Sequence, residues 1–183
     1  MKAFWFEPEE GKLRFNDGRK PEAGVTHKVE GKLAMCEFGL HASKKTLDAL
    51  KYAQSNIVWL VELSGEILEG DDKCCATKRT YIKRLDAEKI LFQCSCRFAL
   101  SVAHLWDMPP VVREFLETGK EELRDAARDA ARDAAWAAAR AAARDAARDA
   151  AWAAAWAAAR VAARDEQNNL LQTLILQEMG EMI

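Results

Sequence analysis

The chain has 183 residues, half of them apolar, and its 27 basic side chains nearly balance its 29 acidic ones. A formal net charge of −2 creates no overall field that would attract nucleic acid or an anionic membrane, so either kind of binding needs a local patch. Charged residues interrupt every long apolar run, and the acidic first ten residues lack the apolar core of a secretory signal. We therefore expect a cytoplasmic protein without a membrane span.

The first quarter of the chain shows short strand patterns separated by turn residues. We expect strands at Lys2–Phe6, Lys28–Leu33 and Gly39–Ala42. Ser43 is placed to cap a helix over Lys44–Ala53, whose leucines recur at helical spacing.

The strongest strand pattern of the whole chain lies at the start of its middle third. Ile57–Leu63 is a nearly continuous aliphatic run, which predicts a buried central strand. A further strand is expected at Lys89–Phe92, followed by a helix over Cys96–Trp106 that two prolines end. The second of them, Pro110, marks the expected domain boundary.

The last third of the chain reads as helical throughout. A short helix over Val111–Thr118 closes at Gly119, and an alanine-rich segment over Glu121–Glu166 follows. The tail after it has apolar residues at three and four residue spacing: Leu170, Leu171, Leu174, Ile175 and Met179.

Together these patterns predict an α+β protein. A small mixed-sheet domain with helices should occupy residues 1–110, and residues 111–183 should form an alanine-rich arm, as one helix or a helical hairpin, with an amphipathic C-terminal helix.

The alanine-rich arm has a period of four residues. From Arg124 to Arg164 every fourth residue is Arg or Trp, and Asp often follows the Arg, which adds local ion pairs to alanine's high helix propensity. Because the α-helix repeats every 3.6 residues, this row advances by about 40° per repeat. In a straight helix Trp136 would therefore lie nearly opposite Trp152 and Trp156, so the arm either folds back or has partners on more than one side.

This geometry favours protein contacts by the arm. Close approach of another helix buries alanine surface best, so the expected partner is a host protein or a second copy of the chain, with a solvated scaffold helix as the alternative. The eight Arg and nine acids between Glu121 and Glu166 disfavour nucleic-acid binding there. The candidate partner-binding residues are Arg128, Arg132, Trp136, Arg144, Arg148, Trp152 and Trp156.

The segment from Phe38 to Gly65 resembles the second core motif of the ADP-ribosyltransferase superfamily. Gly39, His41, Ala42 and Ser43 match its strand motif and Tyr52 matches the tyrosine of its helix. The resemblance implies a nicotinamide pocket, NAD as cofactor and His41, Ser43 and Tyr52 as catalytic residues. The first strand, however, lacks the His or Arg of that superfamily, and Glu88 matches its catalytic Glu only loosely.

The order of GLHAS, DALKYA, ELSGEI and DDKCCATKR before an alanine-rich tail resembles a group of uncharacterised phage and bacterial proteins. This similarity implies a phage or mobile-element origin and a bacterial host cytoplasm, without indicating a reaction.

Ordinary structural roles compete with catalysis at these residues. A lone histidine between apolar residues is most often a hydrogen-bonded packing residue, and Ser43 suits a helix cap better than a nucleophile. No zinc-type spacing appears among the five cysteines, so we expect reduced thiols and no metal.

Five basic residues cluster between positions 73 and 84, near two threonines and a tyrosine. This cluster either binds the phosphates of a nucleotide or nucleic acid, or forms a solvated strand face. Its members are Lys73, Lys78, Arg79, Lys83 and Arg84.

The sequence thus leaves three functional hypotheses. The favoured one is a phage-encoded, non-catalytic interaction protein without a cofactor that inhibits a host protein such as an antiviral defence complex. The alternatives are an NAD-dependent ADP-ribosyltransferase and a binder of nucleotides or phosphates through the basic cluster.

Overall fold

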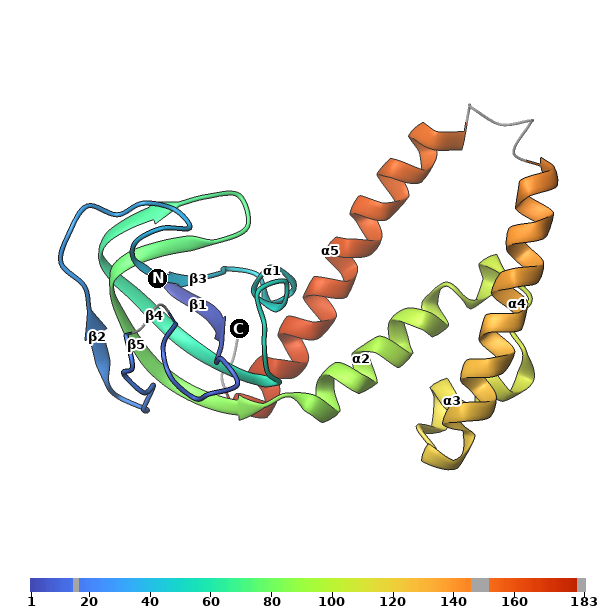
Figure 1. Cartoon of the computed structure of the whole chain (residues 1–183), viewed down its shortest axis with the longest axis horizontal. Coiled ribbons are helices and arrows are strands. Elements are labelled where there is room, and N and C mark those ends of the chain that lie inside the picture. The colour runs from blue at the N-terminus through green and yellow to red at the C-terminus, as the bar shows by residue number, and fades with distance from the viewer. Residues whose placement is uncertain (15–16, 146–151, 181–183) are drawn as a thin grey trace. The chain divides into compact units, whose positions relative to one another are not determined.

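The computed structural model of the chain describes residues 1–14, 17–145 and 152–180, and of residues 140–145, 152–159 and 161 it describes the backbone alone. The protein is α+β, as predicted, with an antiparallel sheet and several helices in this part of the chain (Figure 1). It forms two compact units. One comprises Met1–Leu91 together with the C-terminal residues from Asn168, and the other comprises Phe92–Gln167.

The sheet of the first unit is built around two long strands. β4 (Ile57–Glu69) and β5 (Cys74–Asp86) pair antiparallel along their length, and β1 (Lys2–Phe6) pairs with the free edge of β4 (Figure 1). The other edge of β5 is shared by two short strands, β3 (Leu40–Ala42) near its start and β2 (Thr26–Lys28) near its middle.

Most strand predictions are confirmed in position. β1 matches its expected bounds, and β4 begins where expected but continues to Glu69. The strand expected over Lys28–Leu33 is wrong, because β2 ends at Lys28 and residues 29–33 form no strand. The backbone turns away there, although the Val29 amide still donates to the Thr77 carbonyl over 2.9 Å.

A two-way hydrogen bond closes β1, β4, β5 and β3 into a ring. The Phe4 amide donates to the Ser43 carbonyl over 2.8 Å, and the Ser43 amide donates back to the Phe4 carbonyl over 2.9 Å. The expectation that Ser43 caps the next helix is therefore wrong. Its backbone extends the pairing of β3, so the helix starts later.

Helix α1 (Thr46–Leu50), shorter than expected, receives its cap from a distant part of the chain. Its N-cap residue, Lys45, makes no side-chain cap bond. Instead the Asn168 Oδ1 accepts from the Leu47 amide over 3.2 Å and from the Thr46 hydroxyl over 3.4 Å. Thr46 and Asn168 are both buried, so this cap is shielded from water.

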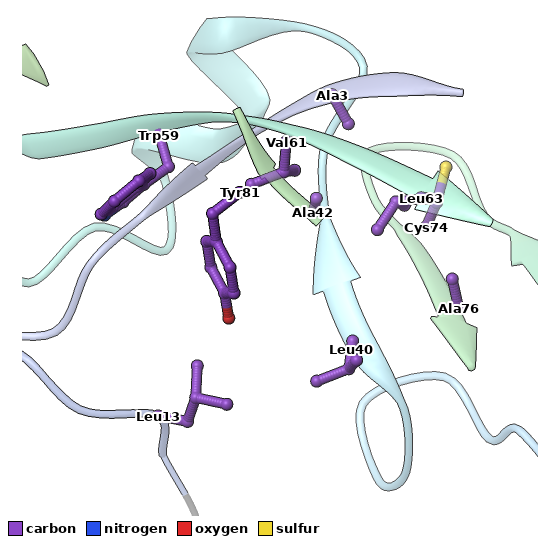
Figure 2. Packing of buried hydrophobic residues seen from close by; sticks show 10 residues of the cluster. All are labelled: Ala3, Leu13, Leu40, Ala42, Trp59, Val61, Leu63, Cys74, Ala76 and Tyr81. Carbon is purple, nitrogen blue, oxygen red and sulfur yellow. The ribbon is translucent and has the colours of Figure 1, made fainter. Parts of the chain in front are cut away.

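The core of the first unit surrounds Tyr81. Its side chain extends from β5 toward the space between Leu13 and Leu40 (Figure 2). The Trp59 ring meets the Tyr81 ring edge to face at 5.3 Å between centroids, a favoured geometry for buried aromatic pairs.

The C-terminal part of α5 (Trp152–Met179) also buries apolar side chains in the first unit. Leu171, Ile175 and Met179 are fully buried, and the Lys83 ammonium donates to the Met179 carbonyl. The apolar face predicted for the C-terminal helix is confirmed. It belongs to the first unit, which contains the sheet, because an apolar helix face has to pack against a core. The boundary expected near Pro110 lies within the second unit.

The second unit begins in α2 (Glu88–Ser101), where the strand expected over Lys89–Phe92 is wrong. The Ala87 carbonyl accepts the first helical bond, from the Leu91 amide over 2.8 Å, and the Asp86 carboxylate accepts from the Glu88 amide over 3.0 Å just before it. After η1 (Ala103–Leu105), α3 (Pro110–Thr118) ends at a left-handed Gly119, as predicted.

The alanine-rich arm is helical where the structure describes it. After η2 (Glu121–Leu123), helix α4 (Arg124–Asp145) packs against α3, and Ala127 lies in a small core with Val112 and Met108. Whether the arm is one helix or a hairpin depends on residues 146–151, which lie outside the described residues. None of the described helices combines the length and apolar character that a membrane span requires.

The predicted contact residues of the arm are only partly described. Arg128 pairs with Asp125 and Arg132 with Asp129 on the exposed surface, as expected for local helix pairs. Trp136 is 63% exposed. Arg148 and the side chains of Arg144, Trp152 and Trp156 lie outside what the structure describes.

Candidate functional site

A cavity of about 420 Å³ opens in the first unit beside β1 and β3. We call it the Arg79 cavity. It is lined by residues from both strands, from the turn before β3, from the end of α1 and from β5. Those that matter below are Trp5, Cys36, Phe38, His41, Ser43, Tyr52, Lys73 and Arg79.

Arg79 is the most unusual residue of the cavity, because its charged side chain is only 2% exposed. Its Nη1 donates to the His41 carbonyl over 2.6 Å, and its Nη2 and Nε donate to the Tyr81 hydroxyl over 2.8 and 3.2 Å. The guanidinium lies 4.1 Å from the centroid of the Trp5 ring and 5.1 Å from that of Tyr81. These contacts fix its position firmly.

The Arg79 charge lacks an acidic partner among the described residues, since no carboxylate there lies within 4.0 Å of it. The Asp17 carboxylate raises the pKa of Arg79 only by longer-range electrostatic attraction, because two short hydrogen bonds of 2.5 and 2.6 Å bind that carboxylate to Arg19. Burial lowers the pKa of Arg79. Of its five N–H groups, one on Nη1 and one on Nη2 have no partner in the described part of the chain.

The Tyr81 hydroxyl links Arg79 to a buried histidine. The Tyr81 hydroxyl oxygen accepts two hydrogen bonds from Arg79 and lies 3.1 Å from His27 Nδ1. The hydroxyl proton is therefore donated to that nitrogen. Burial lowers the pKa of His27, and the charges of Arg19 and Arg79 lower it further. His27 is therefore neutral at pH 7 and accepts from Tyr81.

The hydrogen bonds of His41 determine its tautomer. Its Nδ1 lies 3.0 Å from the Gly39 carbonyl, which can only accept, so this nitrogen carries the proton. Its Nε2 accepts from the Cys36 amide over 3.1 Å. Burial lowers the pKa of His41. Both nitrogens of the neutral ring are thus engaged, which suits a packing role and leaves no free base.

Gly39 makes this arrangement possible through a backbone conformation that other residues rarely adopt. Its φ is +130°, and a Cβ added there would lie 2.9 Å from the Leu33 side chain and 3.0 Å from the Cys75 Cβ. Glycine at this position lets the turn approach β5 closely and present its carbonyl to His41.

Ser43 and Tyr52, the other two residues expected to be catalytic, also line the cavity. Ser43 is 2% exposed, and its hydroxyl has no hydrogen-bond partner among the described residues. The Tyr52 hydroxyl donates to Asp72 over 2.7 Å, and its carbonyl accepts from Arg14 over 2.6 Å. The structure therefore brings His41, Ser43 and Tyr52 to one cavity.

Two of the five residues in the predicted basic cluster line this cavity. Lys73 joins Arg79 there, with its ammonium 4.3 Å from the Tyr52 ring centroid. Arg84 pairs with the buried Glu7 at 3.2 Å, and Lys83 donates to the carbonyl of Met179. Lys78 is exposed on β5. The cluster is thus divided between a cavity and a strand surface.

Sequence reasoning missed three contributors to the site: Trp5, His27 and Cys36. Alternation along β5 was the available signal for the inner residues, because Arg79 and Tyr81 are two positions apart and so share a face. The partners of that face come from β1 and β2, whose pairing the sequence alone does not reveal.

In the ranges 1–14, 17–145 and 152–180, no group of three His, Cys, Asp or Glu side chains lies close enough to hold a metal ion.

Residues 15–93 match the model of a family described as a domain of unknown function (DUF7666). The match covers less than half of the chain and includes Ser43, Tyr52 and Arg79, but not Trp5. No curated protein and no solved structure matches the chain. The region that carries most of the cavity is thus similar to an uncharacterised domain family, while the expected phage origin stays a prediction.

Proposed function

We propose that the Arg79 cavity binds a small anionic ligand of the nucleotide class. The observation that carries this proposal is the buried Arg79 guanidinium, which has fixed geometry, two available N–H groups and no carboxylate partner among the described residues.

A buried charge without a counter-charge is costly, because burial removes several kcal/mol of hydration per ion that only a partner of opposite sign offsets. An anion from outside the protein supplies that partner. The two N–H groups without a partner lie on Nη1 and Nη2, and guanidinium N–H groups are strong donors to carboxylate and phosphate oxygens. Lys73 and Arg14, which also line the cavity, add positive charge to the same space.

Aromatic side chains favour a ligand that also carries a ring. Phe38 and Tyr52 both line the cavity and are each 38% exposed, and the Lys73 ammonium lies over the Tyr52 ring, 4.3 Å from its centroid. The cavity volume of about 420 Å³ falls within the usual range for small-molecule sites, about 300 to 1,000 Å³. A nucleotide whose phosphate binds Arg79 and whose nucleobase stacks on these rings would use both the positive charge and the aromatic side chains of the cavity.

A thermal-shift titration tests the proposal with ATP, AMP, adenosine and inorganic phosphate. We expect ATP or AMP to raise the melting temperature and adenosine to have no effect, because it lacks the anionic group. Arg79→Met should abolish the shift. Lys78→Met, which removes the same charge from the exposed neighbouring position, should leave it intact. The proposal fails if no phosphate compound shifts the wild-type chain, or if Arg79→Met responds like wild type.

A second candidate is an NAD-dependent ADP-ribosyltransferase. It is supported by the presence of His41, Ser43 and Tyr52 at one cavity, which Glu37 also lines. Incubation with labelled NAD and bacterial lysate should label a target, and His41→Ala should reduce the product because it removes the bonds that hold the Gly39 turn. An unlabelled lysate, or labelling that His41→Ala does not change, speaks against transfer.

Inhibition of a host protein through the arm remains the prediction made from the sequence. The 63% exposure of Trp136 on α4 supports it, because large exposed aromatic residues often anchor protein interfaces. Trp136→Ala should then lower the yield of a stoichiometric partner in a pull-down from host lysate. If no such partner is recovered by the unmodified chain, the arm does not act this way.

A further inference from the structure

Cys36 differs from the other four cysteines of the chain in exposure. It is exposed, whereas Cys74, Cys75, Cys94 and Cys96 are buried. Burial raises the pKa of each of these four thiols, which keeps them protonated and weakly nucleophilic. Cys36 is therefore the cysteine most accessible to a reagent dissolved in water.

Cys36 has a cationic neighbour. Lys73 lines the same cavity as Cys36, and the Cys36 side chain is the largest cause that raises the pKa of Lys73. The Cys36 amide donates to His41 Nε2 over 3.1 Å, which holds the backbone that carries the sulfur in place at the cavity. An exposed cysteine in electropositive surroundings is the usual setting of a reactive thiol.

The sulfur lies at a cavity that has unused polar groups. Cys36, Ser43 and Arg79 all line it. Ser43 is 2% exposed as a residue, and its hydroxyl has no hydrogen-bond partner in the described part of the chain. Arg79 has two N–H groups that also have no partner there. A group attached to the Cys36 sulfur would find a hydroxyl and a guanidinium within this space, both suited to a carboxylate.

We propose that Cys36 is a modification site that undergoes thiol–disulfide exchange with anionic low-molecular-weight disulfides, such as oxidised glutathione, and retains the carboxylate-bearing half in the Arg79 cavity. This inference does not depend on nucleotide binding. It requires only the exposed sulfur, the adjacent ammonium and the polar groups of the cavity.

The exchange step is balanced without a further oxidant. Cys36 loses its proton to water, and its thiolate attacks one sulfur of the small disulfide, so that a new S–S bond forms as the old one breaks. The departing thiolate takes a proton from water. The Cys36 sulfur is oxidised and the departing sulfur is reduced, so the small disulfide supplies the oxidising equivalent.

The test uses three aliphatic disulfides of different charge on the full chain: oxidised glutathione (anionic), hydroxyethyl disulfide (neutral) and cystamine (cationic). Adduct formation is followed by intact mass spectrometry, and each rate is divided by the rate of the same disulfide with free cysteine. We expect one adduct, located at Cys36 by peptide mapping and absent in Cys36→Ser. The normalised rate should fall from anionic to neutral to cationic, by about tenfold overall at low salt, and converge at 1 M salt, where the screening length is only about 3 Å.

A charge-matched pair of lysine variants tests the selectivity. Lys73→Gln should remove most of the preference for the anionic disulfide, whereas Lys32→Gln, an exposed lysine four residues before Cys36, should preserve it. Circular dichroism checks that both variants keep the fold. An adduct on a buried cysteine with Cys36 unmodified overturns the proposal, as do normalised rates that do not depend on charge or a preference that Lys73→Gln leaves unchanged.

Discussion

Replacing Arg79 with methionine should remove ligand binding at little cost to the fold. Methionine is of similar length and apolar, so it fills the space beside Trp5 and Tyr81 while it removes the buried charge. The variant loses the three hydrogen bonds of the guanidinium to Tyr81 and the His41 carbonyl. It also no longer has to bury an ion without a counter-ion.

The magnitude follows from these opposing effects. Truncating one member of a paired buried charge typically costs about 3 to 5 kcal/mol, because the other member is left unpaired. Replacing Arg79 leaves no unpaired carboxylate in the protein. The lost hydrogen bonds, each worth about 1.5 to 3 kcal/mol, are therefore opposed by the several kcal/mol that burying the guanidinium no longer costs. We expect the free energy of unfolding to change by less than about 2 kcal/mol.

Urea unfolding followed by tryptophan fluorescence measures this change, with an unchanged m value showing that the same surface unfolds. Arg84→Met provides the contrast. It deprives the buried Glu7 carboxylate of its cationic partner, although Trp59 Nε1 still donates to Glu7 over 2.7 Å. That variant should lose about 1 to 3 kcal/mol. A loss above about 4 kcal/mol in Arg79→Met would refute the reasoning, because it would show that the charge is already compensated in the free protein.

Three further predictions follow from the first unit. Asn168→Ala should lower the unfolding free energy by about 1 to 2 kcal/mol because α1 loses its cap, whereas Asn169→Ala, its exposed neighbour, should change it by less than about 0.5 kcal/mol; equal losses in thermal melts would exclude the cap. Gly39→Ala should cost about 1 to 3 kcal/mol in the same assay, since its φ of +130° is strained for alanine, and a neutral effect would contradict the described turn. The pKa of His27 and His41 is lowered in the folded state, so the unfolded chain binds more protons below pH 6.5 and stability should rise from pH 5 to pH 7, by at most about 1.4 kcal/mol per pH unit for each histidine. His27→Gln should flatten this rise in denaturant titrations at several pH values, and an unchanged slope would argue against a buried neutral His27.

The fold was most predictable where local pattern and tertiary environment agree. Lys2–Phe6 and the start of β4 are strand-forming in sequence and are paired in the sheet, so both predictions hold. Lys89–Phe92 was misjudged because a short apolar run fits a strand or a helix equally well, and here it continues into the helix α2. At Ser43 the pattern of a helix cap was outweighed by a long-range pairing with Phe4.

The candidate site was predictable in some of its members but not in their roles. The motif around His41, Ser43 and Tyr52 did identify residues that share a cavity. Their chemistry could not be derived from the sequence, because the engagement of both His41 nitrogens depends on the turn that brings Cys36 back toward β3. Likewise, the five cations between positions 73 and 84 look equivalent in sequence, and only the pairing of β5 shows that Arg79 is buried while Lys78 is exposed.

The cap that Asn168 provides to α1 has a consequence for the order in which the protein is assembled. Residue 47 and its capping group are separated by 121 positions, so this contact cannot form during synthesis until nearly the whole chain described here has left the ribosome. Contacts of such long sequence separation carry a high loop-closure entropy and tend to form late. The capped start of α1 should therefore be completed at the end of folding, after the sheet has formed.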